Sequence, residues 1–348
     1  MSRLMLLFSV ASFTPVPLIA LGALHGGLWA VAALLSMTVL TFAIDRLIAR
    51  TPRQNPQAEF PATDPLAAVL AVSHLALMPL VVAALAGHWL GLGGKIALFL
   101  AAGTFMGQVS NANAHELIHH GNARLRALGI AVYVSLLYGH HNSAHRLVHH
   151  VHVATHRDPN SAPLGLSFWR FAPRAWIGSF RAGWQAESAR LRHRRAPAWR
   201  HPYAIYVGGA LALVILSAAL WGLAGALLYV VLASYATIQL LMTDYVQHYG
   251  LRRRIQPDGR IEPVRAWHSW DAWQPWSSAM LLNAPRHGDH HSHPMRRFPA
   301  LTLPGSDGAL LPRPLPVMAA IALVPRRWRK VMDPRARAVM ARHPGDHA

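Results

Sequence analysis

The sequence predicts an all-α integral membrane protein, with six transmembrane helices paired in three hairpins. Three observations carry this prediction. Hydrophobic residues make up 53% of the 348 residues, several apolar stretches approach the length of a bilayer, and the 33 basic residues are distributed unevenly around them. A hydrocarbon core of about 30 Å needs about 20 mainly apolar helical residues. The whole chain, residues 1–348, is expected to form one membrane-embedded domain.

Six apolar stretches are expected to be the spans. Gly26 and Gly27 mark the first turn, and Pro15 and Pro17 are expected to kink the first helix. A polar link at 51–64 separates the first pair from the second, and the fourth stretch runs on into a histidine motif. The stretches cover about residues 4–24, 26–44, 66–86, 96–110, 203–223 and 224–246.

The basic residues predict which side of the membrane each end faces. The three hairpin turns, near His25, His88 and Gly222, contain one basic residue, Lys95, and the other 32 of the 33 lie on the opposite side. Cytoplasmic loops carry the excess of Lys and Arg, so this opposite side and both termini are expected to be cytoplasmic. The protein is therefore expected in a cell membrane, in the bacterial case the inner membrane, in contact with its lipids.

Nine histidines form four motifs, which we call the four histidine motifs, and all of them fall on the side expected to be cytoplasmic. Imidazole is the commonest side-chain metal ligand, and nine are too many for one ion. The sequence therefore predicts a histidine-rich cap for two metal ions. The motifs contribute His115 and His119; His145, His149 and His150; His248; and His287, His290 and His291.

The spacing within the motifs suggests how they share two ions. His115 and His119 are four residues apart and share a helix face, and His145 and His149 repeat that spacing. His150 is rotated by about 100° from His149 on an α-helix, so it can reach a second ion. Four carboxylates near the motifs are candidates for orienting the imidazoles by hydrogen bonds: Glu116, Asp158, Asp244 and Asp289.

The ligand type alone does not choose the metal, because imidazole suits Zn, Cu, Fe and Ni. Residues 115–119 also match the H-E-x-x-H motif of zinc proteases. Seven further histidines argue against that assignment, since a catalytic zinc needs three protein ligands. Soluble di-iron bundles use a set of Glu and Glu-x-x-His ligands that this chain lacks.

At these motifs the sequence resembles the membrane-bound alkane 1-monooxygenases, within the wider fatty acid desaturase and hydroxylase superfamily. The resemblance covers roughly residues 96–301 and includes HELIHH, AHRLVHHVHVATHRDP, DYVQHYG and RHGDHHSHPMRRF. The HYG and RHGDHH segments favour the alkane hydroxylases over the desaturases. The chain departs from the family's patterns at His120, Ala144, Val148 and Gln247.

The resemblance implies a non-haem di-iron monooxygenase that uses O2 to hydroxylate an alkane or alkyl chain, with a terminal C–H bond as the expected target. It implies two iron ions held by the nine histidines, and a hydrocarbon channel between the helices. It also implies electrons from a rubredoxin or ferredoxin-type donor with its NAD(P)H reductase. The chain has no cysteine and no Gly-rich nucleotide-binding fingerprint, so an external donor is expected.

Three alternatives stay open at this point. A fatty acyl desaturase or lipid hydroxylase of the same superfamily would use the same motifs. A membrane metal-binding or transport protein is a second possibility, although transporters place their ligands near the bilayer midplane. A zinc intramembrane protease is the third. Nucleic acid is not expected as a partner, because the basic residues flank apolar stretches and no nucleic-acid motif is present.

Overall fold

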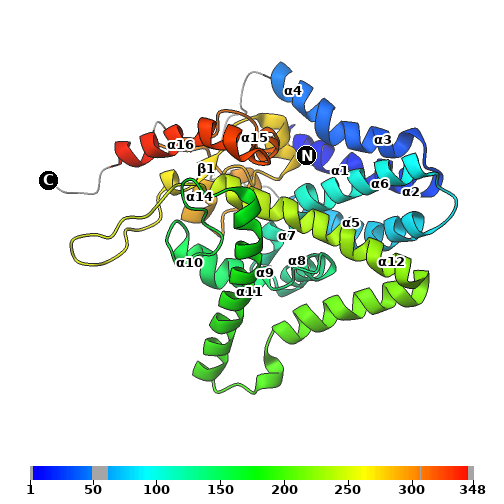
Figure 1. The fold of residues 1–348 in the computed structure, drawn as a ribbon, viewed down its shortest axis with the longest axis horizontal. Coiled ribbons are helices and arrows are strands. Elements are labelled where there is room, and N and C mark those ends of the chain that lie inside the picture. Colours follow the sequence, from blue (N-terminus) through cyan, green and yellow to red (C-terminus); the bar gives the residue numbers. More distant parts are fainter. Residues whose placement is uncertain (1–2, 49–61, 306, 344–348) are drawn as a thin grey trace.

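A computed structural model describes residues 3–48, 62–305 and 307–343, and this part of the chain is mostly helical (Figure 1). Five helices within it are long and apolar enough to cross a membrane. Helices of this kind indicate an integral membrane protein. The five run over Arg3–His25, Leu28–Leu47, Thr63–Ala86, Leu92–Ile118 and Tyr203–Gln247.

The first two of these helices are built from shorter elements. Arg3–His25 consists of α1 (Arg3–Phe13) and α2 (Pro15–His25), which meet at Thr14. Two glycines at positive φ, Gly26 and Gly27, form the turn into the second helix. That helix contains α3 (Leu28–Leu35), a π-helical turn η1 (Ser36–Leu40) and α4 (Thr41–Leu47).

The next pair brings the first histidine motif to the end of a long helix. Helix α5 (Thr63–Ala86) is continuous through Pro79, and the chain then turns into α6 (Leu92–Phe105). A π-helical turn, η2 (Met106–Ser110), joins α6 to α7 (Asn111–Ile118), which carries His115 and Glu116. The added residue of a π-helical turn rotates everything that follows it about the helix axis.

Helix α12 (Tyr203–Gln247) has 45 residues, and it bends back on itself. A straight helix of this length would be about 68 Å long, roughly twice the thickness of a bilayer core. Its backbone leaves the helical region at Trp221 and Gly222, where Gly222 has φ 67° and ψ −172°. Figure 1 shows the two arms, 203–220 and 223–247, meeting at this break.

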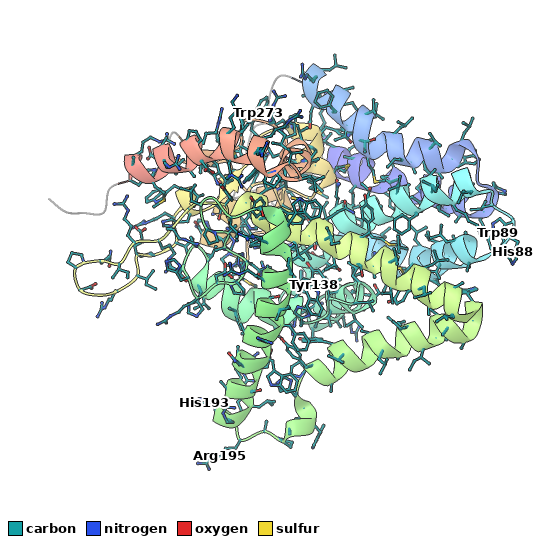
Figure 2. The ribbon with its side chains drawn as sticks, in the orientation of Figure 1. His88, Trp89, Tyr138, His193, Arg195 and Trp273 are labelled. Carbon is teal, nitrogen blue, oxygen red and sulfur yellow. The ribbon has the colours of Figure 1, made fainter. Side chains whose placement is uncertain are left out.

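The turns between the long helices gather at one end of the molecule. Trp89, between α5 and α6, donates a hydrogen bond of 2.9 Å from its indole nitrogen to the carbonyl oxygen of Ala23 in α2. Figure 2 shows His88 and Trp89 at this end, and Figure 1 shows the break of α12 on the same side. The short helices that carry the remaining histidine motifs lie at the opposite end (Figure 1).

Shorter elements cover the histidine end. Helix α11 (Phe168–His193) is amphipathic and extends away from the body to His193 (Figure 2). Two short strands, β1 (Trp270–Asp271) and β2 (Ala309–Leu310), pair in parallel. The other elements are α8 (Ala123–Ser135), α9 (His141–Ala144), η3 (His145–His149), α10 (His150–His152), η4 (Ala198–Arg200), η5 (Ala266–His268), α13 (Pro275–Met280), α14 (His287–Ser292), η6 (Phe298–Ala300), α15 (Leu315–Ala322) and α16 (Pro325–Arg342).

The apolar stretches expected from the sequence are helical in the structure, apart from the turn at Gly26–Gly27 and the interruptions at Thr14 and at Trp221–Gly222. The fourth helix begins four residues earlier than expected, at Leu92, and continues past residue 110 into the first histidine motif, as expected. The last two stretches form the two arms of α12, with the break at Trp221–Gly222 in the expected place. Of the polar link at 51–64, residues 51–61 lie outside the described residues.

A buried carboxylate fixes α4 to the histidine end. Asp45 is 6% exposed, and its Oδ1 accepts backbone N–H groups of Trp276 (2.8 Å) and Ser277 (3.1 Å). These two residues form the first turn of α13, where backbone N–H groups lack helical partners and favour a negative charge. Asp45 therefore couples the second long helix to the segment that leads into α14.

Replacing Gly222 with alanine should destabilise the protein by about 1–3 kcal/mol, because its φ and ψ fall in a region open almost only to glycine. Thermal unfolding in detergent measures this. Gly208→Ala is the matched control, since Gly208 lies inside the same helix and a Cβ there meets nothing within 4 Å. Equal melting temperatures for both variants would show that the break does not depend on the glycine.

Candidate metal centre

Helix α7 presents its two motif histidines to the interior. His115 and His119 occupy positions one helical turn apart, as their spacing predicts, and their ring centroids are 5.2 Å apart. Neighbouring Asn113 anchors α7, because its side-chain Nδ2 donates a 2.8 Å hydrogen bond to the carbonyl oxygen of Ala67 in α5. The first motif is therefore fixed to the membrane helices.

The second motif folds differently from the α-helix that its spacing predicts. His145, His149 and the residues between them form the π-helical turn η3, in which hydrogen bonds join residues five apart. His145 consequently aligns with His150, and their Nε2 atoms are 2.9 Å apart. The rings of His145 and His149 nevertheless remain neighbours, with centroids 5.1 Å apart, but His149 belongs to a different candidate metal group from His145 and His150.

The remaining histidines come from the end of α12 and from α14. His248 directly follows α12 and is fully buried. His287, His290 and His291 occupy the six-residue helix α14, and all three are buried. His287 reaches His248, with 3.0 Å between their Nε2 atoms, and His291 reaches His287, with 3.1 Å between theirs.

All nine motif histidines come together in two groups, each of which could hold a metal ion. Within a group, the nitrogens that could bind an ion all lie within 4.8 Å of one another. The groups are neighbours, since the ring centroids of His150 and His291 are 4.6 Å apart. We call them the five-histidine group, His115, His119, His145, His150 and His290, and the four-histidine group, His149, His248, His287 and His291.

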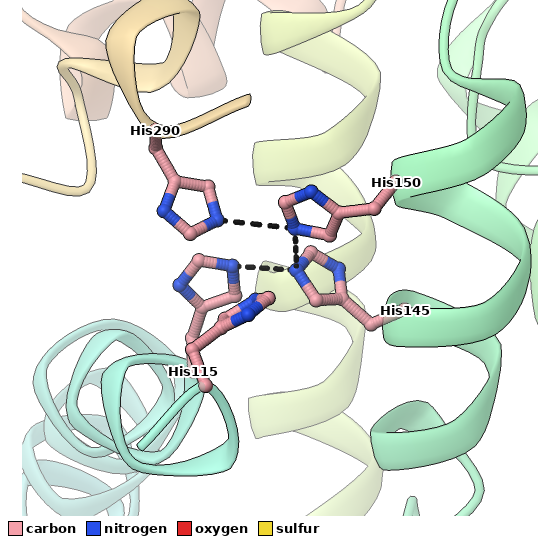
Figure 3. Close-up of side chains that lie close together, drawn as sticks. His115, His145, His150 and His290 are labelled. Atoms are coloured by element: carbon pink, nitrogen blue, oxygen red, sulfur yellow. Dashed lines mark hydrogen bonds between the residues drawn. The ribbon is translucent and has the colours of Figure 1, made fainter. Parts of the chain in front are cut away.

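The spacing of the nitrogens suits coordination to one ion (Figure 3). In the five-histidine group, successive Nε2 atoms lie 2.8 Å apart for His115 and His145, and 3.2 Å apart for His150 and His290. Ligand nitrogens at about 2.0–2.1 Å from a metal ion are separated by about 3 Å when the angle between them is near 90–100°. The Nε2 atoms of this group are therefore spaced as the ligand atoms of one shared ion would be.

Hydrogen bonding among the imidazoles cannot satisfy these nitrogens. The Nε2 of His145 faces the Nε2 atoms of both His115 and His150, yet one ring nitrogen is a donor or an acceptor and not both. The Nε2 atoms of His119 and His149 are buried and have no hydrogen-bond partner among the described residues. Burying such polar atoms is costly unless a partner is supplied, and a cation supplies one.

Most of the motif imidazoles that lie outside the membrane helices are kept uncharged by burial, and the uncharged form is the one that binds metal. Desolvation lowers the pKa of His287, His290 and His291 well below the ordinary value of 6.5, and the nearby imidazoles lower it further. At neutral pH these rings are therefore uncharged. A neutral imidazole has the free lone pair that a metal ion requires.

Asp158 is the one candidate carboxylate that contacts a motif histidine. Its Oδ2 lies 2.8 Å from Nδ1 of His149 and also accepts a 2.6 Å hydrogen bond from Ser161 Oγ. Burial alone would lower the pKa of His149, but the charge of Asp158 and this hydrogen bond raise it above 6.5. The contact places the His149 ring proton on Nδ1 and leaves Nε2 facing the four-histidine group.

The other three candidate carboxylates contact groups other than the nine motif imidazoles; Asp289, for example, contacts Nδ1 of His293 at 2.8 Å. Glu116 pairs with Nε of Arg297 at 2.9 Å. Asp289 pairs with Arg296 and accepts the backbone N–H of Thr302 at 2.8 Å. Asp244 accepts a 2.6 Å hydrogen bond from Nδ2 of Asn160. These contacts position the backbone segments that carry the histidines.

Asp271 is a supporting residue that no motif in the sequence indicated. It is fully buried, and its Oδ1 accepts a 2.9 Å hydrogen bond from the backbone N–H of Gly288 at the start of α14. A Cβ at Gly288 would lie 2.6 Å from the carbonyl oxygen of Ala266 and 2.9 Å from Asp271 Oδ2. Asp271 and Gly288 together fix the position of α14.

A cavity of about 90 Å³ adjoins both groups, where it reaches His115, His145 and His287. Its other walls come from η2, α7, α12 and α15. It also touches His141, which belongs to neither group. A pattern in the sequence indicates part of this cavity. Polar side chains recur every three or four residues on the helices that lead to the histidines, so they share a helix face. They are Gln108 and Asn111 before His115, and Gln239, Thr243 and Gln247 before His248.

The fold and the two groups define a class: a helical membrane protein with histidines arranged for two metal ions at one end of its long helices. Residues 87–303 match the fatty acid desaturase family. Alkane 1-monooxygenase 1 of Pseudomonas aeruginosa is 32% identical over 331 residues, which cover 91% of this chain and 85% of that protein.

Two further relatives are also named alkane 1-monooxygenases. Alkane 1-monooxygenase 2 of Pseudomonas aeruginosa is 35% identical over 254 residues, 71% of this chain and 66% of that protein. Alkane 1-monooxygenase 2 of Alcanivorax borkumensis is 32% identical over 250 residues, 71% of this chain and 65% of that protein. The chain belongs to the alkane 1-monooxygenase family within the fatty acid desaturase superfamily, as its histidine motifs suggested.

Replacing Asp158 with asparagine should weaken metal binding about 10–100-fold, because the partner that orients the His149 ring loses its charge. Titration of the metal-free protein with ferrous iron against a competing chelator measures the affinity. Asp258→Asn, on an exposed turn, is the matched control. Unchanged affinity in Asp158→Asn would mean that Asp158 only shapes the turn at Pro159.

Proposed function

We propose that this protein is a non-haem di-iron monooxygenase that hydroxylates an alkane or alkyl chain, with a terminal C–H bond as its target. One observation carries the proposal: two adjacent groups of buried or partly buried histidines adjoin a cavity between membrane helices. The relatives named alkane 1-monooxygenases support this reaction over others of the superfamily. The substrates are O2 and a hydrophobic chain.

The nine histidines would hold two iron ions, one in each group. The donor set fits iron, because imidazole suits it and no thiolate is present anywhere in the sequence. Five and four protein ligands exceed the three of a catalytic zinc site. Bound iron would supply the redox chemistry needed to reduce O2 and to hydroxylate an unactivated C–H bond.

The protein's own residues contribute position and a dry environment. Asp158 holds the ring proton of His149 on Nδ1, so that Nε2 stays free as a ligand. Leu240, Met242 and Leu281 line the cavity and offer an apolar surface to an alkyl chain. A chain lying in this narrow cavity presents its end to the histidines first, which favours terminal hydroxylation.

In this proposal the membrane topology consists of six spans in three hairpins, because α12 supplies two arms. The ends that carry the histidine groups face the cytoplasm, since 32 of the 33 basic residues lie on that side. Electrons come from a rubredoxin or ferredoxin-type protein with its NAD(P)H reductase. A cytoplasmic site is accessible to such soluble donors.

The purified protein should bind about two irons per chain, and affinity should fall at acid pH because protons compete for the imidazole nitrogens. Elemental analysis and chelator competition measure both quantities. His150→Ala and His291→Ala, one from each group, should each reduce the iron content. His193→Ala, at the exposed end of α11, should retain it. One zinc and no iron per chain in active protein would contradict the proposal.

Membranes supplied with rubredoxin, its reductase, NADH and ¹⁸O2 should convert alkanes into alcohols that carry ¹⁸O. Gas chromatography with mass spectrometry identifies the product and the position of the hydroxyl group. Without the donor proteins, turnover should stop, because the sequence has no cysteine and no Gly-rich nucleotide-binding fingerprint through which NADH could supply electrons. An unlabelled alkene in place of an alcohol would assign the protein to the desaturases.

A further inference from the structure

A second cavity meets the one beside the histidines. We call the first the inner chamber and the second the outer groove. The outer groove has a volume of about 420 Å³ and lies between η1–α4 and α15, with Thr38, Val39 and Phe42 on one wall and Val317 and Ala320 on the other. Val39 and Phe42 are exposed apolar residues on a helix suited to cross a membrane, so the groove opens toward lipid.

Two residues line both the inner chamber and the outer groove, Gln108 and Pro316. They therefore lie on the boundary between the two spaces. Gln108 precedes His115 by seven residues, about 10 Å along a helix. An alkyl chain that extends from the groove to the histidines has to pass this boundary.

The side chain of Gln108 is held across the boundary by a second glutamine. Its Nε2 donates a hydrogen bond of 3.2 Å to Oε1 of Gln239 in α12. The Oε1 of Gln108 is buried and has no hydrogen-bond partner among the described residues. Gln108 is thus restrained by one hydrogen bond. Its Oε1 has no hydrogen-bond partner to lose when the side chain rotates.

Gln239, in contrast, is fixed. Its Nε2 donates a 2.8 Å hydrogen bond to the carbonyl oxygen of Gly103. A Cβ at Gly107 would lie 2.6 Å from that same Nε2, so the glycine allows Gln239 to lie against the α6–η2 backbone. The pair consequently has one rigid member and one member able to move.

The geometry points to Gln108, restrained by Gln239, as the residue that controls passage of the alkyl chain from the outer groove into the inner chamber, and that therefore sets which chains reach the histidines. This inference rests on the proposed function for the identity of the chain as substrate. Polar side chains inside membrane helices are costly and commonly mark a substrate path. Gln108 acts by excluding bulky chains, and it takes no part in the chemistry.

The first test varies the size of residue 108 in the full-length protein. Gln108→Ala should raise the kcat/KM for an alkane that carries a cyclohexyl group a few carbons from its reacting end, relative to an unbranched alkane of equal length, by about tenfold or more. The change should lie mainly in KM, because the reacting end and the histidines are unaltered. Gln185→Ala, at an exposed position of α11, is the matched control and should leave the ratio unchanged.

The second test needs no turnover. A long-chain alkyl diazirine is photolysed with the protein without reductant, and the labelled peptides are located by mass spectrometry. The wild-type protein should be labelled both in the groove, near Val317, and in the chamber, near Leu240 and Leu281. Gln108→Trp should lose chamber labelling about tenfold and keep groove labelling, whereas Gln185→Trp should keep both.

These tests separate the inference from the proposed reaction. Chamber labelling that persists in Gln108→Trp, or an unchanged selectivity in Gln108→Ala, overturns the role of Gln108 even if the protein hydroxylates alkanes. Chamber labelling that depends on Gln108 supports the role even if alkanes are not hydroxylated. Should Gln108→Trp fail to fold, Gln239→Ala opens the boundary from α12, and unchanged labelling and selectivity in that variant overturn the inference.

Discussion

The convergence of nine imidazoles, six of them buried and three partly buried, is the constraint on which the rest of this structure depends. Their Nε2 atoms lie about 3 Å from one another, and neutral rings have too few N–H donors to satisfy all of these nitrogens by hydrogen bonds. Two metal ions could satisfy the lone pairs that are left. The two long helices that end in motif histidines, α7 at the end of Leu92–Ile118 and α12, therefore have to deliver their last turns to one place.

The supporting contacts follow from that constraint. Asp45 and Asp271 cap the short helices α13 and α14, and Arg297 joins Glu116 of α7 to Asp64 at the start of α5. Asp45 and Arg297 link the histidine end to the long helices that carry Asp45 and Asp64, and Asp271 links α14 to the strand β1. Buried carboxylates at helix starts stabilise short helices that would not persist alone in water.

Much of this arrangement could be predicted from the sequence. The apolar stretches located the long helices, and the basic residues separated the turn end from the histidine end. The split of His149 from His150 followed from their adjacency. The π-helical turn η3 could not be predicted, because nothing in the local sequence of residues 145–149 demands hydrogen bonds between residues five apart. Asp271 and Gln108 were missed for a related reason: their roles depend on segments far away in the chain.

The order of the motifs along the chain has a consequence for biosynthesis. His115 to His150 leave the ribosome early, whereas His287, His290 and His291 emerge after both arms of α12. Each group takes at least one histidine from α14, so neither group is complete until that six-residue helix docks against Asp271. Neither candidate metal group therefore has its full set of histidines until the chain beyond α12 has been synthesised and folded.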